Sequence, residues 1–241
     1  MSKSIVAFPV LPGMETAALN ELPQYCRDHM DEYTESRRNA GITMERVYDM
    51  DTPMGKLNIL YAESDSDFSG SVMKLATSGK AFDAYFLGKL HEITGVDFTQ
   101  PPPGPGPELL GEWWDPAVTE RRAGLAFCAP LAAGRTDAGR AFAKEVWGVR
   151  KEELAESRRA TGITGEVVVL NTTPMGDLVC VYLEGNDPAA GNREFAASQT
   201  PFDRWFKDEC KGIFPPEISF DDPVPPVTQI FEWMEVAVPT A

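Results

Sequence analysis

The sequence contains few of the side chains that bind metal ions. It has two histidines and four cysteines in 241 residues, with no Cys-x-x-Cys motif and no two histidines one helical turn apart. Zinc sites are built from such closely spaced pairs. We therefore expect no bound metal ion and no cofactor. Isolated cysteines without a disulfide framework are typical of a reducing compartment, which favours a cytoplasmic protein.

Positive charge and long apolar segments are also scarce. The chain has 22 Lys+Arg against 37 Asp+Glu, a net charge of −15. Nucleic acids and anionic membranes bind clustered cations, so we expect neither as a partner. No apolar segment reaches the ~20 residues that a membrane-spanning helix needs. The N-terminus also lacks the apolar segment of a signal peptide.

What the sequence does contain is one segment in two copies. Residues 35–63 recur at 156–184, and 16 of the 29 positions are identical. Two copies about 120 residues apart indicate a duplicated domain rather than a solenoid. We predict one unit at residues 1–115, a linker at 116–123 and a second unit at 124–241.

Each unit is expected to follow the order β-α-β-β-α-β, the split βαβ arrangement of ferredoxin-like domains. Apolar residues recur every three or four positions in the helices. Pro23 is expected to kink the first helix because it donates no hydrogen bond to Leu19. The predicted elements of the first unit are a strand at 5–10, a helix at 14–38, a hairpin at 43–63, a helix at 68–94 and a strand at 109–114.

The strand at 178–184 is apolar on both faces. A sheet with helices on one face only should alternate apolar and polar residues. The second face must therefore be covered, and the other unit supplies the obvious cover. The predicted fold class is α+β, with two tandem ferredoxin-like βαββαβ units forming an intramolecular pseudo-dimeric α/β barrel. Since the pseudo-partner is in the same chain, we expect a monomer.

Three motifs resemble those of a known group of proteins. They are Glu-Ser-Arg-Arg-x-x-Gly-Ile-Thr, Thr-Pro-Met-Gly-Asp-Leu-Val and Pro-Phe-Asp-x-Trp-Phe-Lys. They resemble bacterial tandem-repeat proteins of the dimeric α/β-barrel superfamily, over nearly the whole chain. That superfamily includes cofactor-free monooxygenases, muconolactone isomerases, polyketide cyclases, and haem-binding dismutases and peroxidases. The resemblance implies a ligand between the sheet and the helices of a unit.

Two functions remain open at this point. One is a cofactor-independent monooxygenase, isomerase or cyclase that acts on an aromatic or polyketide-like small molecule. The alternative is a non-catalytic binding or scaffold protein. A closed cavity of roughly a few hundred Å³, lined by Tyr61, Glu63 and His29, would favour the enzyme, whereas a solid core in both units would favour the scaffold.

The candidate catalytic residues are Tyr61, Glu63 and His29. Tyr61 and Glu63 share a face of a strand because they lie two residues apart. A carboxylate beside an apolar cavity has a raised pKa and can act as an acid or base. An ion pair with one of the repeated arginines is the more common role for Glu63 or its counterpart Glu184.

His29 differs between the copies, since its counterpart is Arg150. We interpret residues that both copies share as requirements of the fold, and residues that differ as candidates for function. Because histidine titrates near neutrality and His29 occurs only in the first copy, we predict that any active site lies in the first unit.

The candidate ligand-binding residues are Tyr33, Arg37 and Trp113. Tyr33 adds a hydroxyl where the second copy has Leu154. Arg37 suits a ligand carboxylate, but a cation in the last turn before a glycine is more often a helix terminus. Trp113 either belongs to the core or forms the wall of an aromatic pocket.

Overall fold

A computed structural model describes residues 1–100, 105–173 and 176–235 of the chain. It contains two four-stranded sheets in which all strand pairs are antiparallel. The predicted fold class, α+β with two repeated βαββαβ-like units, is confirmed. The stacking of the two sheets into a barrel stays a prediction. None of the described helices is long and apolar enough to span a bilayer.

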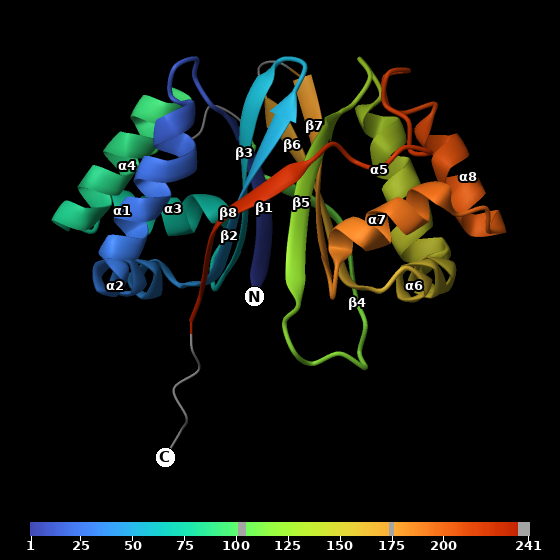
Figure 1. The fold of residues 1–241 in the computed structure, drawn as a ribbon, viewed down its shortest axis with the longest axis horizontal. Helices are drawn as coiled ribbons and strands as arrows, with labels where there is room; N and C mark the ends of the chain where they lie inside the picture. The colour runs from blue at the N-terminus through green and yellow to red at the C-terminus, as the bar shows by residue number, and fades with distance from the viewer. Residues whose placement is uncertain (101–104, 174–175, 236–241) are drawn as a thin grey trace. The chain divides into compact units, whose positions relative to one another are not determined.

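The first sheet has the strand order β1-β3-β2-β8, and its helices cover one face (Figure 1). The elements of this unit are β1 (Ser2–Pro9), the π-helical turn η1 (Ala17–Glu21), α1 (Leu22–Asp28), α2 (Met30–Ala40), β2 (Ile42–Thr52), β3 (Gly55–Ser64), α3 (Phe68–Ala76), α4 (Ala81–Thr94) and β8 (Val227–Met234).

The second sheet has the order β4-β6-β7-β5 and repeats this arrangement. Its elements are β4 (Glu108–Trp114), β5 (Ala123–Pro130), α5 (Thr136–Lys144), the π-helical turn η2 (Glu145–Val149), α6 (Lys151–Ala160), β6 (Ile163–Thr173), β7 (Gly176–Gly185), α7 (Pro188–Ala197) and α8 (Pro201–Cys210).

The closing strands are exchanged between the repeats. The strand at 109–114, predicted to close the first unit, is β4 and pairs with β6 of the second unit. The first sheet is closed instead by β8, which pairs with β2. An ion pair favours this choice, because Arg46 on β2 lies 2.7 Å from Glu232 on β8. The position equivalent to Arg46 on β6 is the apolar Val167.

The exchange moves the boundaries of the units. The compact units are Met1–Gly106 with Val227–Ala241, and Pro107–Pro226. The predicted division at 116–123 therefore falls inside the second compact unit, between β4 and β5. Repeat alignment alone missed this, since it matches the copies without showing which sheet each closing strand joins.

The first helical segment breaks at His29 rather than at Pro23. His29 separates α1 from α2 with φ −121° and ψ 42°. Pro23 lies in the first turn of α1, directly after the π-helical turn. The chain is helical on both sides of Pro23, and the missing N–H follows a π-helical turn in which the Leu22 N–H donates to the Ala17 carbonyl. Gly41 ends α2 with φ +73°, as predicted.

The predicted hairpin turn joins β2 to β3. Thr52 Oγ1 donates a hydrogen bond to the Gly55 carbonyl at 2.7 Å, and Gly55 has φ +121°, which favours glycine. In the second copy of this turn, Pro174 and Met175 lie outside the described residues.

Candidate ligand-binding site

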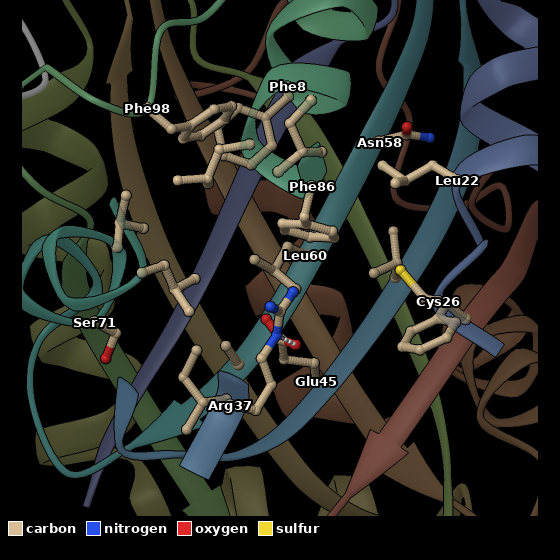
Figure 2. Close-up of a pocket in the computed structure, with 18 of the residues that line it drawn as sticks. Phe8, Leu22, Cys26, Arg37, Glu45, Asn58, Leu60, Ser71, Phe86 and Phe98 are labelled. Carbon is tan, nitrogen blue, oxygen red and sulfur yellow. Dashed lines mark hydrogen bonds and ion pairs between the residues drawn. The ribbon is translucent and has the colours of Figure 1, made fainter. Parts of the chain in front are cut away.

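A cavity of about 110 Å³ lies in the first unit, between the helices and the sheet. Alternate residues of β3 form its floor, and Figure 2 shows Leu60 from this strand and Phe86 from α4 facing one another across it. Phe8 and Phe98 line one end, and Leu22 and Cys26 line another (Figure 2). An apolar cavity of ~150 Å³ is enough to bind benzene, so this space is of the order needed for one ring.

Two charged side chains lie within this apolar lining. Arg37 on α2 is 1% exposed and Glu45 on β2 is 5% exposed. Arg37 Nε donates to Glu45 Oε2 at 2.7 Å (Figure 2). Tyr33 Oη donates to the same carboxylate oxygen. Buried charges are retained only when they are paired in this way, because their desolvation is costly.

The guanidinium of Arg37 is held in place by two aromatic rings. Its central carbon lies 4.0 Å from the centre of the Tyr33 ring and 4.2 Å from that of Phe86. Its Nη1 also donates to Ser36 Oγ at 3.0 Å, and Ser36 in turn donates to Asp83 on α4. These contacts fix both the plane and the position of the cation.

The second unit has the same ion pair with a different geometry. Arg158 donates to Glu166 twice, from Nε to Oε2 at 2.7 Å and from Nη2 to Oε1 at 3.1 Å. In the first unit Arg37 donates to Glu45 only through Nε. Within residues 1–100, 105–173 and 176–235, neither Nη2 of Arg37 nor Oε1 of Glu45 forms a hydrogen bond with the protein. Arg37 Nη2 is thus an unused hydrogen-bond donor and Glu45 Oε1 an unused acceptor, and both residues line the cavity.

Burial determines the protonation of the lining residues. It is the main cause that raises the pKa of Tyr33 well above its ordinary value, and the nearby Glu45 raises it further. Burial alone would lower the pKa of Arg37, but Glu45 outweighs burial and the pKa is raised. Burial raises the pKa of Cys26 to about 12. At neutral pH these groups are therefore a phenol, a cation and a thiol.

The three predicted catalytic residues do not line this cavity. On β3 the cavity is lined by residues 58, 60, 62 and 64, so Tyr61 and Glu63 lie on the opposite face. There Tyr61 Oη donates to Glu63 Oε1 at 2.5 Å. His29 stacks on the Tyr25 ring, and its Nδ1 lies 2.9 Å from the Tyr25 carbonyl oxygen.

Two of the three predicted ligand-binding residues, Tyr33 and Arg37, do line the cavity. Their role in binding a ligand stays a prediction. Trp113 lies on β4 and packs against the core of the second unit. Its equivalent Trp233 is buried in the first unit, where its indole N–H donates to Thr34 Oγ1 at 3.1 Å.

Glu45 is the residue that the sequence analysis missed. The expected carboxylate partners of the repeated arginines were Glu63 and Glu184, but the structure pairs Arg37 with Glu45 and the second arginine with its equivalent. The signal was present in the repeat, because Glu45 and Glu166 are identical residues within otherwise largely apolar strands.

No metal site is seen in the described part of the chain, where no three His, Cys, Asp or Glu residues are grouped suitably. The lining of the cavity contains an ion pair and aromatic rings.

Comparison with known proteins supports the fold. No protein-family model matches the sequence, and no curated protein sequence matches it. The structure is similar to that of an anthrone oxidase-like protein, with a TM-score of 0.50 and 13% identity over 95% of this chain and 90% of the other. It is also similar to a "putative monooxygenase" from Lactobacillus acidophilus NCFM, with a TM-score of 0.52 and 11% identity over 96% and 94% of the two chains. At these identities the likeness shows a shared fold alone.

Proposed function

We propose that the first unit binds a small ring compound that carries a carbonyl or phenol oxygen. The observation that supports this is an apolar cavity whose lining includes a buried, incompletely hydrogen-bonded Arg37–Glu45 pair. The apolar walls suit a ring, while Arg37 Nη2 suits an oxygen with partial or full negative charge. A largely apolar pocket with few polar groups is the usual form of a small-molecule site.

The reaction that we propose for this ligand is oxygenation by O₂ without a cofactor. A ring CH₂ group and one O₂ give a ring carbonyl and one water, so no external reductant is needed. The fold is shared with an anthrone oxidase-like protein and a "putative monooxygenase". A cation beside the substrate oxygen would favour the electron-rich form of the ring that reacts with O₂.

The alternative is a binding or scaffold protein without turnover. It is favoured by the presence of the same ion pair in the second unit, where Arg158 and Glu166 satisfy one another and join a helix to a strand. A pair that is structural in one copy needs no catalytic role in the other.

A cavity-filling variant tests the binding site. Ala62 lies across from Glu45 in the sheet, and the equivalent Leu183 lies across from Glu166. Ala62→Leu therefore places the larger residue of the second unit into the cavity. We expect the wild-type protein to be stabilised thermally by cyclohexanone, a one-ring ketone, and Ala62→Leu to lose this response.

The matched control is Leu183→Ala, which alters the second unit and should retain the response. Equal stabilisation of the wild type and Ala62→Leu by cyclohexanone would contradict the proposed site. Oxygen consumption then separates the two functions. An enzyme consumes O₂ in the presence of one-ring ketones such as cyclohexanone and cyclohexane-1,3-dione, whereas a binding protein retains them unchanged.

A further inference from the structure

The two ion pairs differ because of one hydroxyl group. In the first unit Tyr33 Oη and Arg37 Nε both donate to Glu45 Oε2. The second unit has Leu154 at the position of Tyr33. Without a competing donor, its arginine and glutamate form two parallel hydrogen bonds. In the unit that contains Tyr33, the carboxylate of Glu45 therefore forms no hydrogen bond with Arg37 Nη2.

Glu45 Oε1 and Arg37 Nη2, the two atoms without a hydrogen bond to the protein among the described residues, have complementary chemistry. Oε1 of Glu45 is a carboxylate oxygen that can accept a proton, and Nη2 of Arg37 can donate hydrogen bonds to an oxyanion. Both belong to residues at least nine-tenths buried, where water competes little with a bound ligand. A base and an oxyanion donor side by side are what the enolisation of a ketone requires.

Several other polar side chains in the lining form hydrogen bonds within the protein. Thr94 Oγ1 donates to the Leu90 carbonyl at 2.7 Å. Ser64 Oγ donates to the Ser66 carbonyl at 2.5 Å, and Ser71 Oγ is bonded to Ser66 Oγ at 3.0 Å. Arg37 and Glu45 are the charged side chains among the described residues of the lining, and so the groups best suited to act as oxyanion donor and base.

We infer that Glu45 and Arg37 form an acid–base site that removes a proton from the carbon next to the ligand's carbonyl group, with Tyr33 as the positioning residue. The C–H bond breaks and an O–H bond forms on Glu45 Oε1. The electron pair of the C–H bond forms the enolate, whose oxygen is held by Arg37 Nη2. The inference rests on the proposed ligand site and adds the residues that activate the ligand.

Deuterium exchange measures this step without oxygen. The wild-type protein is incubated with cyclohexanone in D₂O under argon, and NMR follows the loss of the proton signal at C2. We expect exchange above the buffer rate. Tyr33→Phe keeps both charges and the ring but lets Glu45 close on Arg37, as in the second unit. It should lower kcat for exchange at least about tenfold and change KM less than about twofold.

Glu45→Gln removes the base and should lower the exchange rate about 100-fold or more, towards that of buffer. Glu166→Gln is its matched control, because it breaks the equivalent buried pair in the second unit and should leave exchange intact. Should Glu45→Gln fail to fold, Tyr33→Phe still tests the inference, since Leu154 shows that the fold does not need the hydroxyl.

Binding and exchange are measured separately, so the two proposals can fail separately. If cyclohexanone stabilises the wild type but its exchange stays at the buffer rate, the acid–base inference is wrong and the binding site stands. If cyclohexanone neither binds nor exchanges, both are wrong. Exchange that survives both Tyr33→Phe and Glu45→Gln also overturns the inference.

Discussion

Filling the cavity should make the protein more stable while removing its ligand site. Ala62→Leu adds three carbon atoms, worth about 0.8 kcal/mol each when buried, or about 2.4 kcal/mol. Eliminating a cavity of about 110 Å³ at ~24 cal/mol per Å³ gives about 2.6 kcal/mol, which is an independent measure of the same gain. Strain from the larger side chain opposes this gain, since adding carbon atoms to a well-packed core lowers the free energy of unfolding by about 1–3 kcal/mol.

We expect a net stabilisation of about 1–2 kcal/mol, because Leu183 shows that leucine fits across from this glutamate in the second unit. At about 2–4 °C per kcal/mol for a chain of this size, the melting temperature should rise by about 2–8 °C. Calorimetry and urea denaturation measure the change. Leu183→Ala, the reverse substitution, should cost about 2–5 kcal/mol. If Ala62→Leu destabilises the protein by more than about 1 kcal/mol, the space beside Ala62 is not available and the reasoning fails.

Three further predictions concern the two units. Arg158→Met leaves Glu166 buried without its partner and should lower the free energy of unfolding, measured by urea denaturation, by about 3–5 kcal/mol. Adding Glu166→Leu should restore most of that stability. If it restores none, the pairing of Arg158 with Glu166 is contradicted. Burial raises the pKa of Cys26 to about 12, so the fraction of Cys26 present as thiolate at pH 8 is lower in the folded protein than in the unfolded chain by a factor on the order of 10³. Iodoacetamide should therefore label Cys26 slowly in the folded protein, and mass spectrometry measures the rate. Because the folded pKa is raised, the folded state binds more protons, and the urea midpoint should fall as the pH rises above about 8.5; a midpoint that rises instead would refute this.

The local elements could be predicted from the sequence because their signals are local. Helical spacing, Gly41 and the turn at Thr52 each act within a few residues. The partner of each closing strand could not be predicted, since the same Glu-Trp pair occurs in both copies. Long-range contacts distinguish them, such as the ion pair of Arg46 with Glu232 and that of Arg140 with Glu108.

The candidate site was predicted in part for a similar reason. Tyr33 was identified because the second copy has Leu154 at its position, and Arg37 because a guanidinium suits a ligand carboxylate. Tyr61 was assigned to the wrong face of β3, because a strand apolar on both faces does not show which one the helices cover. Glu45 was missed because its partner comes from another element, although its repetition in an apolar strand was a usable sign.

The exchanged closing strand also determines when the first unit can be completed during protein synthesis. Arg46 and Glu232 are 186 residues apart. At ~5–20 residues per second, a ribosome needs roughly 10–40 s to make the intervening chain. Throughout that time the edge of β2 has no strand to pair with, and Phe231, one wall of the cavity, does not yet exist. The second unit, whose strands all precede β8, can form its sheet first. The cavity is therefore completed only after the strands of the second unit have been made, and a nascent chain that stops before residue 227 lacks the part of its wall that Phe231 forms.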